Sequence, residues 1–253
     1  NGDGVPDLLV GAPGRRGPTG AFGAGGVDAL SGAKGSLLWR VSGPDGSQFG
    51  VSLAVAGDQN GDGVGDVLVG APTGDSSRGM VVLLSGADGS VLASFHTTAS
   101  VSSFGLTVRA AEDADGDGLG DLFVASPGFR VGSNPVGRIQ LISSASGLGI
   151  AEVVGTGTYT RLGESLASCA DADGDGVDDV MAGAFSGGVA RVLSGADLSE
   201  IAAISVPIPI FRPLAVGGSL DFDGDGVQDW LLGSTSLGLI GTTSVGGIRI
   251  VSG

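Results

Sequence analysis

The stretch Asp113-Ala-Asp-Gly-Asp-Gly-Leu-Gly-Asp121 runs directly into the apolar segment Leu122-Phe-Val124. Carboxylates stand at its positions one, three, five and nine, and glycines stand at positions four and six. In a tight loop of this spacing, alternate oxygens can point to a common centre, and the glycine at position six permits the sharp turn. The stretch therefore predicts a cation-binding loop that opens onto a β-strand.

The same pattern occurs five times along the chain. The other copies are Asn1-Gly-Asp-Gly-Val-Pro-Asp7, which lacks position one, Asp58-Gln-Asn-Gly-Asp-Gly-Val-Gly-Asp66, Asp171-Ala-Asp-Gly-Asp-Gly-Val-Asp-Asp179 and Asp221-Phe-Asp-Gly-Asp-Gly-Val-Gln-Asp229. The five copies hold 18 of the 27 acidic residues. Isolated Asp-Gly turns are common in solvated loops, but carboxylates packed this closely and this repeatedly indicate that a cation offsets their repulsion.

The spacing suits calcium, which takes about six to eight oxygens at roughly 2.3–2.6 Å in a tolerant geometry. Side chains at positions one, three and five, the carbonyl at position seven and a bidentate carboxylate at position nine would form the shell. We expect four complete Ca²⁺ sites and one truncated site. The expected ligands are Asn1, Asp3, Val5 and Asp7; Asp58, Asn60, Asp62, Val64 and Asp66; Asp113, Asp115, Asp117, Leu119 and Asp121; Asp171, Asp173, Asp175, Val177 and Asp179; and Asp221, Asp223, Asp225, Val227 and Asp229.

These loops are not EF-hands, because that loop requires a Glu at position twelve and flanking helices. Position twelve here is Val69, Val124, Ala182 or Leu232. An apolar, strand-like segment follows every loop instead, as in Val67-Leu-Val69. Each cation loop is therefore predicted to join two β-strands.

The loops belong to a longer repeat of 50 to 59 residues, which is the length of a propeller blade. In the second unit, Phe49-Gly50 precedes the loop, and Gly70-Ala-Pro72 and the strand-plus-turn segment Val81-Val-Leu-Leu-Ser-Gly-Ala-Asp-Gly89 follow it. Each unit predicts four short antiparallel strands. We expect an all-β propeller forming one domain, or a fragment of one, over residues 1–253, with units at about 1–48, 49–103, 104–161, 162–211 and 212–253.

This combination of Phe-Gly, the acidic loop and Gly-Ala-Pro resembles the FG-GAP repeat of the integrin α-subunit β-propeller, and the resemblance covers nearly the whole chain. It implies a calcium-stabilised propeller, usually seven-bladed, that recognises ligands or mediates adhesion. Similar arrays occur in bacterial secreted proteins. The fifth unit departs from the pattern, with Arg212-Pro213 for Phe-Gly and Gly233-Ser-Thr235 for Gly-Ala-Pro. The 18 expected strands favour part of a larger ring, and a closed five-bladed ring is the alternative.

Composition excludes several other classes of protein. Twelve basic residues against 27 acidic ones give a net charge of −15, which disfavours nucleic acid and anionic membrane surfaces as partners. Cys169 is the single cysteine and His96 the single histidine, so disulfide frameworks and multi-histidine sites are excluded. No apolar run reaches the roughly 18 residues of a membrane span, and we expect no membrane insertion.

Three functions fit this sequence. The first is a non-catalytic, calcium-binding module for extracellular recognition, secreted or at the cell surface. The alternatives are the propeller domain of a secreted glycan-active or other hydrolytic enzyme, and a purely structural spacer. His96 has no obvious catalytic partner, and we expect Cys169, Trp39 and Trp230 to pack in the core. The fold alone cannot decide between these functions.

A partner is predicted to bind on the face opposite the cation loops. In an antiparallel meander the successive connections alternate between two faces, so the cation loop and the Ser-Gly-Ala turn share one face. The opposite face would carry the long loops Gly14–Gly25 and Gly128–Gly137. We expect Arg15, Arg16 and Arg130 there to recognise carboxylates of a protein or an acidic glycan.

Overall fold

The computed structural model describes residues 1–253 except 101, 158, 187, 206–213, 227, 241–242 and 253. Eighteen of its strands form five successive sheets, here called blades one to five. Blade one contains β1 (Leu8–Gly11), β2 (Gly26–Leu30) and β3 (Leu37–Ser42); blade two contains β4 (Ser52–Val55), β5 (Val67–Ala71), β6 (Met80–Leu84) and β7 (Val91–His96); blade three contains β8 (Thr107–Ala110), β9 (Leu122–Ala125), β12 (Arg138–Ile142) and β13 (Gly149–Val154). Blade four contains β14 (Ser165–Ser168), β15 (Val180–Gly183), β16 (Val189–Leu193) and β17 (Glu200–Ser205), and blade five contains β18 (Leu214–Leu220), β19 (Asp229–Ile240) and β20 (Thr243–Val251).

Within each blade the strands pair antiparallel in the order of the chain, as the sequence predicts. The expected 18 blade strands are all present in the described part of the chain. The structure adds a small hairpin, β10 (Arg130–Val131) and β11 (Asn134–Pro135), inside the long loop of blade three. It also adds a short turn, α1 (Gly74–Ser77), whose residues Asp75 and Ser76 have left-handed backbone angles.

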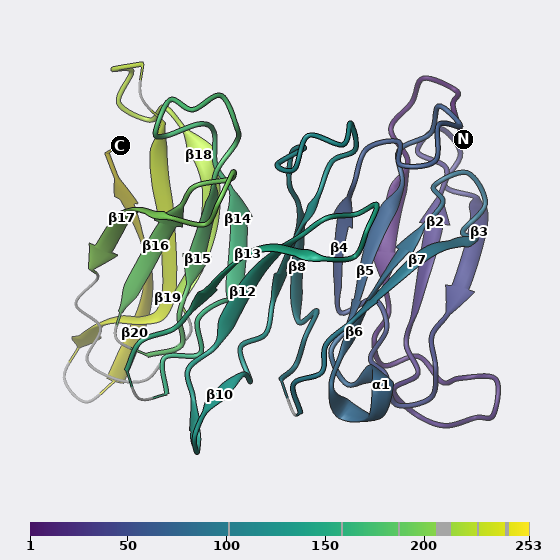
Figure 1. Ribbon diagram of the computed structural model, residues 1–253, viewed down its shortest axis with the longest axis horizontal. Coiled ribbons are helices and arrows are strands. Elements are labelled where there is room, and N and C mark those ends of the chain that lie inside the picture. Colours follow the sequence, from purple (N-terminus) through teal and green to yellow (C-terminus); the bar gives the residue numbers. More distant parts are fainter. Residues whose placement is uncertain are drawn as a thin grey trace.

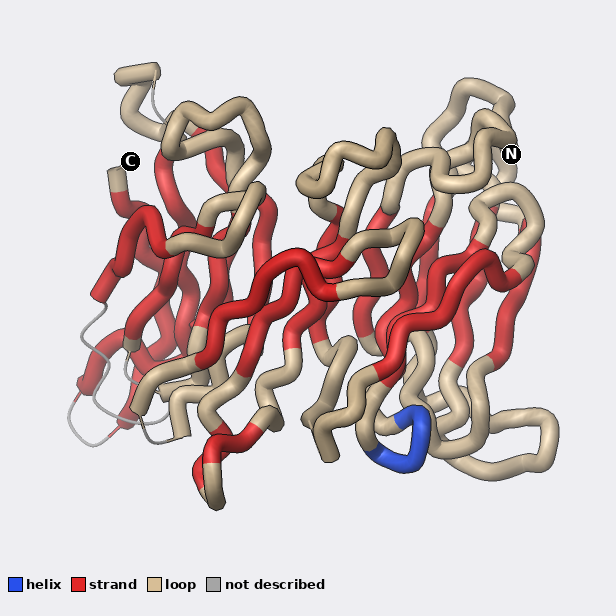
Figure 2. The backbone as a smooth tube through the Cα atoms, in the orientation of Figure 1, coloured by secondary structure: helices blue, strands red, loops and turns tan. Residues whose placement is uncertain are grey.

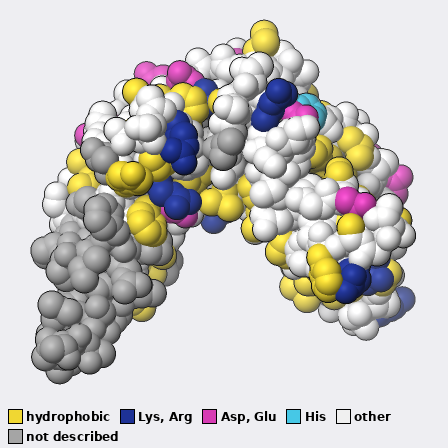
Figure 3. Space-filling view, turned by 90° about the horizontal axis from the view of Figure 1, so that it is seen from below, with side chains coloured by type: hydrophobic (Ala, Val, Ile, Leu, Met, Phe, Trp, Pro, Cys, Tyr) yellow, Lys and Arg dark blue, Asp and Glu magenta, His cyan; other side chains and the backbone are white. Residues whose placement is uncertain are grey.

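The blades stack face to face along an arc around an open hollow (Figure 3). Figure 1 places α1 and β10 on the lower side and the amino terminus, where the first cation loop begins, on the upper side. The backbone tube in Figure 2 shows the connecting loops gathered at these two sides, with the strands between them. The arrangement is the all-β, four-stranded-blade propeller that the repeat predicts.

The hydrophobic core lies between neighbouring blades. On β5, Val67 and Val69 face blade one, where they pack with Trp39, whereas Leu68 faces blade three and packs with Phe104. All five of these residues are buried. Because both faces of the central strands are covered, these strands read as continuous apolar runs instead of alternating apolar and polar residues.

The Phe-Gly pair of one unit contacts the Gly-Ala-Pro segment and the third strand of the preceding blade, and this contact is here called the clasp. Phe104 is buried in the core between blades two and three and makes a parallel bridge to Gly79, just before β6. The backbone of the following Gly105 lies against Gly70, where an added Cβ would come within 2.0 Å of the Gly105 carbonyl oxygen. A side chain at position 70 would therefore push the two blades apart, which explains the glycine of Gly-Ala-Pro.

The single residues expected in the core are found there. Cys169 is buried, and burial raises the pKa of its thiol to about 12. Trp39 is buried and donates from Nε1 to the Gly86 carbonyl oxygen at 2.8 Å, and Trp230 packs against the core of blades four and five. His96 is exposed, with Nδ1 3.5 Å from an Asp75 carboxylate oxygen. Among the described residues no helix is long and apolar enough to cross a membrane.

Candidate metal centres

The first aspartate of each complete loop organises the loop backbone around itself. In blade three, Asp113 accepts hydrogen bonds from the backbone N–H groups of Gly116 and Asp117 at 2.7 and 3.1 Å through Oδ1, and from Gly118 at 2.8 Å through Oδ2. Both glycines have positive φ, at 81° and 92°, which few other residues adopt without strain. The repeated Gly-Asp-Gly is therefore needed to wrap the backbone around a carboxylate.

The same hydrogen bonds recur in the other complete loops. Asp58 and Asp171 accept N–H groups from positions four, five and six of their own loops, and Asp221 accepts them from positions four and six. Donation by the Gly63 N–H is the main cause that lowers the pKa of Asp58 below its ordinary value. The loop thus stabilises the charged form of its first carboxylate, which is the form that binds a cation.

Three of the loops bring carboxylate oxygens to a common point. The groups Asp113–Asp115–Asp121, Asp171–Asp173–Asp179 and Asp221–Asp223–Asp225 each offer oxygens that lie within 4.8 Å of one another. The donors are hard oxygens, which suit calcium or magnesium and not the thiolate-binding metals. The residues present therefore fit a divalent cation of this class.

The described loops differ in how many of the predicted ligands converge. Asp117 and Asp175 lie outside the converging groups of their loops, and Asp229 lies outside that of the fifth loop. At position seven, Leu119 donates its N–H to Asp117 Oδ1 at 2.9 Å, and Val64 and Val177 donate in the same way. Val227, the position-seven residue of the fifth loop, lies outside the described residues.

In the second loop an amide replaces one carboxylate. Asn60 donates from Nδ2 to Asp62 Oδ2 at 2.9 Å, and its Oδ1 accepts the Asp62 N–H at 2.9 Å. The amide thereby takes part in the loop hydrogen bonds while adding no charge. This loop carries one negative charge fewer than the loop of blade three.

The aspartate at position nine has a second role that the sequence does not reveal. Asp121 is fully buried; its Oδ2 accepts the Ala114 N–H at 2.9 Å and its Oδ1 accepts the Ser144 N–H at 3.2 Å. Asp66 and Asp179 make the same two kinds of bond, to position two of their own loop and to the turn between the third and fourth strands. Position nine thus ties the cation loop to the neighbouring turn.

Burial affects the protonation of these position-nine carboxylates. Desolvation is the main cause that raises the pKa values of Asp121 and Asp179, and the backbone N–H bonds oppose it. The nearby carboxylates at positions three and five add to the increase. A buried anion among other anions is a position that a bound cation would stabilise.

The first, shorter loop is arranged differently. Here the α-amino group of Asn1 lies 2.6 Å from Asp7 Oδ2, and the Gly32 N–H donates to Asp7 Oδ1 at 3.0 Å. Asp3 accepts the Val5 N–H at 2.9 Å, as position five does in the other loops. The bond from the amino group is the main cause that lowers the pKa of Asp7.

The predicted partner residues occupy unlike environments on the opposite face. Arg15 forms a two-pronged ion pair with Asp28, at 2.7 and 2.8 Å, and is partly buried. Arg16 is exposed, stacks 3.3 Å above the ring centre of Phe22 and donates to the Gly20 carbonyl oxygen. Exposed Arg130 donates to the Ser133 carbonyl oxygen across the β10–β11 hairpin. Of these three arginines, Arg16 and Arg130 are exposed and Arg15 is partly buried.

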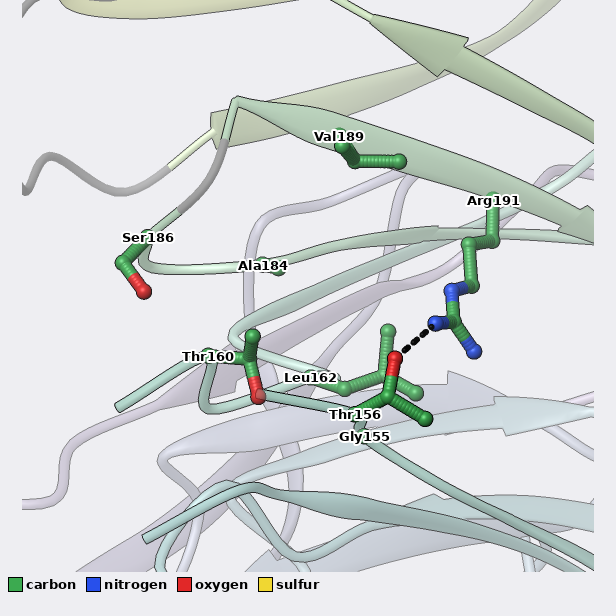
Figure 4. Close-up of a pocket in the computed structure, with 8 residues that line it drawn as sticks. All are labelled: Gly155, Thr156, Thr160, Leu162, Ala184, Ser186, Val189 and Arg191. Atoms are coloured by element: carbon green, nitrogen blue, oxygen red, sulfur yellow. Dashed lines mark hydrogen bonds between the residues drawn. The ribbon is translucent and has the colours of Figure 1, made fainter. Parts of the chain in front are cut away.

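A small cavity lies between the segment that joins blade three to blade four and residues at the end of β15 and on β16 (Figure 4). Its volume is about 180 Å³, and its lining includes Thr156, Leu162 and Arg191. Arg191 donates from Nη2 to Thr156 Oγ1 at 3.0 Å and pairs through Nε with Glu200 at 3.3 Å. Its charge is thus already matched within the blade.

A family model described as the FG-GAP repeat matches residues 49–84, which run from the Phe-Gly pair to the end of the third strand of blade two. Residues 49–84 thus match one FG-GAP repeat, and the chain resembles integrin-like FG-GAP proteins. It is similar to integrin alpha-5 of Xenopus laevis, with 32% identity over 75% of this chain and 20% of the relative. Integrin alpha-8 of Mus musculus is 30% identical over 78% of this chain and 20% of the relative. The chain thus spans about a fifth of the length of these curated relatives.

Solved structures share the fold of these FG-GAP blades at low sequence identity. The rhamnogalacturonan lyase YesW matches with a TM-score of 0.55 and 14% identity, covering 98% of this chain and 47% of the lyase. A protein of unknown function from Bacteroides caccae matches with a TM-score of 0.50 and 12% identity, covering 90% of this chain and 64% of that protein. At these identities the likeness shows the fold alone.

Proposed function

We propose that this integrin-like FG-GAP protein is a calcium-stabilised propeller module for extracellular recognition or adhesion. The observation that carries the proposal is the convergence of carboxylate oxygens to within 4.8 Å in three loops on one face. In the loops of the second, third, fourth and fifth blades alike, the first aspartate accepts backbone N–H groups of its own loop. Such regularity supports a shared requirement for the same ion.

Calcium would be held by the side chains at positions one, three, five and nine and by the carbonyl group at position seven. The sites proposed as complete are those of blades two to five, and the first loop is proposed as truncated. When bound, the ion supplies positive charge that offsets the repulsion between the loop carboxylates. Extracellular calcium modules bind with Kd values of roughly 10⁻⁴–10⁻³ M, which fits secretion into a calcium-rich environment or exposure at the cell surface.

Equilibrium dialysis with calcium tests this proposal directly. We expect about four ions per chain, and about three in Asp117→Ala, which lacks the proposed position-five ligand of the third loop. Gln140→Ala, at a half-buried position of β12 outside the loops, serves as the control and should retain the full number. Fewer than two bound ions in the unaltered chain would contradict the proposal.

We further propose that residues 1–253 act as one propeller domain or as part of one. Each hydrophobic cluster is shared by two neighbouring blades, so no described blade has a core of its own. The chain should therefore unfold cooperatively. Two well-separated calorimetric transitions would argue for independent units.

Partner binding is proposed for the face opposite the cation loops, through Arg16 and Arg130. A guanidinium suits the carboxylates of acidic peptides or glycans, and loops on a rigid scaffold commonly carry recognition. Arg15 would act indirectly by fixing the base of its loop through Asp28. The lyase likeness is one of fold alone, so we propose no catalytic role for these residues.

Two soluble polyanions can test this face, namely polyglutamate for an acidic peptide and polygalacturonate for an acidic glycan. Arg16→Ala combined with Arg130→Ala should weaken binding of at least one of them without changing calcium-dependent melting. The matched control is Lys34→Ala, which removes one positive charge from the turn on the cation-loop face. Equal loss in the control, or binding that survives the double change, would show that the other face or general charge is responsible.

A further inference from the structure

Two exceptions to the repeat meet in space between blades two and three. Position two of the cation loop is Ala114 in the third blade and Ala172 in the fourth, but Gln59 in the second. In the turn between the third and fourth strands, the residue after the first serine is Gly86 in the second blade and Gly195 in the fourth, but Ser144 in the third. The two exceptional residues are 85 positions apart, and Ser144 Oγ donates to Gln59 Oε1 at 2.8 Å.

Every polar atom of the Gln59 side chain is bonded. Its Nε2 donates to the Ala56 carbonyl oxygen at 2.6 Å, within its own blade, and to the Gly120 carbonyl oxygen at 3.0 Å, at position eight of the next cation loop. Its Oε1 accepts the Ser144 hydroxyl. A partly buried amide with three partners is held in one place, so Gln59 fixes the two loops relative to each other.

The bonds continue on both sides to the position-nine aspartates. The backbone N–H of Gln59 donates to Asp66 Oδ2 at 2.8 Å. The backbone N–H of Ser144 donates to Asp121 Oδ1 at 3.2 Å. Asp66 and Asp121 are therefore joined across the blade interface through Gln59 and Ser144. Both aspartates are proposed ligands of their respective cation sites.

A thinner connection links the next pair of loops. Glu112, just before the third loop, accepts the Asp178 N–H at 3.1 Å, and Asp178 occupies position eight of the fourth loop. Glu112 is exposed and makes one such bond, whereas Gln59 makes three. The structure thus provides a strong link between loops two and three and a weaker link between loops three and four.

From these contacts we infer that Gln59 and Ser144 couple cation binding in loops two and three, so that filling one site raises the affinity of the other. The inference rests on the proposed calcium function. An ion in loop two fixes Asp66 and, with it, Gln59, whose amide then holds Gly120 and Ser144 in the arrangement that loop three needs to bind. Gln59 is in this sense a positioning residue for both sites. Thermodynamic linkage makes the effect reciprocal.

The coupling can be measured site by site in the full chain with calcium alone as the ligand. The amide NMR signals of Gly116 and Gly118 report occupancy of loop three, and Asp62→Ala disables loop two. We expect Asp62→Ala to lower the calcium affinity of loop three about fivefold, at the lower end of the usual range for linked sites. In the Gln59→Ala background the same substitution should have no effect on loop three.

The repeats of the chain indicate which substitutions should leave the fold intact. Alanine already occupies position two in loops three and four, so Gln59→Ala suits the loop. Ser144→Gly restores the residue of the other turns and should abolish coupling as Gln59→Ala does. Gln140→Ala removes a half-buried glutamine of β12 that lies outside the loops and should leave the fivefold effect intact.

The outcomes separate this inference from the function on which it rests. If no loop binds calcium, the proposed function fails and the coupling fails with it. A second outcome is that calcium binds while Asp62→Ala changes the calcium affinity of loop three by the same factor in the unaltered chain and in the Gln59→Ala chain. That result overturns only the coupling. Gln59→Ala could also lower the melting temperature equally in calcium and in chelator while the coupling is retained. That result would overturn the inference and leave the Gln59–Ser144 contact a purely structural role.

Discussion

The two faces of this propeller follow different rules. On the cation-loop face, successive blades repeat nearly the same hydrogen bonds around the first and ninth positions of each loop. On the opposite face the connections of blades one, two and three differ from one another. Blade one has the long loop that carries Arg16 and Phe22, blade two has the left-handed turn α1, and blade three has the β10–β11 hairpin.

This difference shows where the chain is constrained and where it is free to vary. The repeated face has one task, which is to hold carboxylates close together, and that task admits few solutions. The opposite connections only have to join the second strand of a blade to the third, so their length and chemistry can differ. Specific recognition is therefore best sought on the varied face.

Calcium removal should produce the largest difference between the faces. At about 10 mM calcium and a Kd near 10⁻³ M, each site stabilises the fold by about 1.4 kcal/mol, so four sites give about 6 kcal/mol. For a chain of this size we expect chelator to lower the melting temperature by roughly 10–20 °C. Hydrogen exchange should show the loss at the cation loops and turns and little change at β10–β11. An unchanged melting curve in excess chelator would contradict the proposal that calcium stabilises the fold.

Two aspartates of the same loop should respond differently to substitution. Asp121→Ala deprives the Ala114 and Ser144 N–H groups of their acceptor, so we expect a loss of about 3 kcal/mol even in chelator. Asp117→Ala should cost less than about 1 kcal/mol in chelator and remove one site's share of the calcium effect. Urea unfolding with and without calcium measures both quantities. Equal losses in chelator would contradict the structural role of position nine.

Asp28 tests whether a loop of the varied face is tied to its blade by charge. Arg40 and Arg15 both donate to this carboxylate, which is largely buried. Asp28→Asn should lower stability by about 1–2 kcal/mol at neutral pH. Arg40→Gln, which leaves the pair with Arg15 in place, should cost less.

The effect of Asp28→Asn should also depend on pH. Hydrogen bonds from Arg40 and then Arg15 hold the pKa of Asp28 well below its ordinary value. A carboxyl with a lowered folded pKa stabilises the fold fully above its unfolded pKa, near 3.9, and loses that contribution as the pH falls through the folded pKa. The unaltered chain and Asp28→Asn should therefore converge in stability below about pH 4. A difference that stays constant to pH 2 would contradict the ion pair.

The smallest expected effect has the opposite sign. Ser76 in α1 has φ 57° and ψ 39°, a left-handed conformation that costs most side chains about 1 kcal/mol. Ser76→Gly should therefore raise stability by about 0.5–1 kcal/mol, measured by urea unfolding. Ser94→Gly, in the exposed part of β7, should lower stability by a similar amount, because glycine weakens a strand.

Much of this architecture could be predicted from sequence because the decisive signals are local. The apolar runs after each loop, such as Val67-Leu-Val69, give the second strands, and the Gly-Asp-Gly spacing gives the cation loops. The β10–β11 hairpin lies inside the predicted long loop Gly128–Gly137, with Gly132-Ser133 as its turn. Its strands are two residues long, which is too short for a period-two pattern of apolar residues to indicate them.

The features that the sequence could not reveal join residues far apart in the chain. Asp121 meets the Ser144 N–H, and Gln59 meets Ser144, only because the blades place their loops and turns on one face. Arg15 was expected to be free for a partner, and its pairing with Asp28 depends on the packing of a loop against a sheet. Spacing along the chain predicts the ligand set, whereas the supporting contacts require the fold.

The clasp between blades has a consequence for the order in which the protein matures. Gly25, Gly79 and Gly137 are each bridged by the opening residues of the following unit, namely Phe49, Phe104 and Leu162. During synthesis on the ribosome, a blade can therefore form this bridge only after the first residues of the next unit have emerged. The blades should therefore assemble one at a time from the amino terminus, and each is completed by its bridge to the next unit. A translational pause just before a Phe-Gly pair would leave the preceding sheet without that bridge.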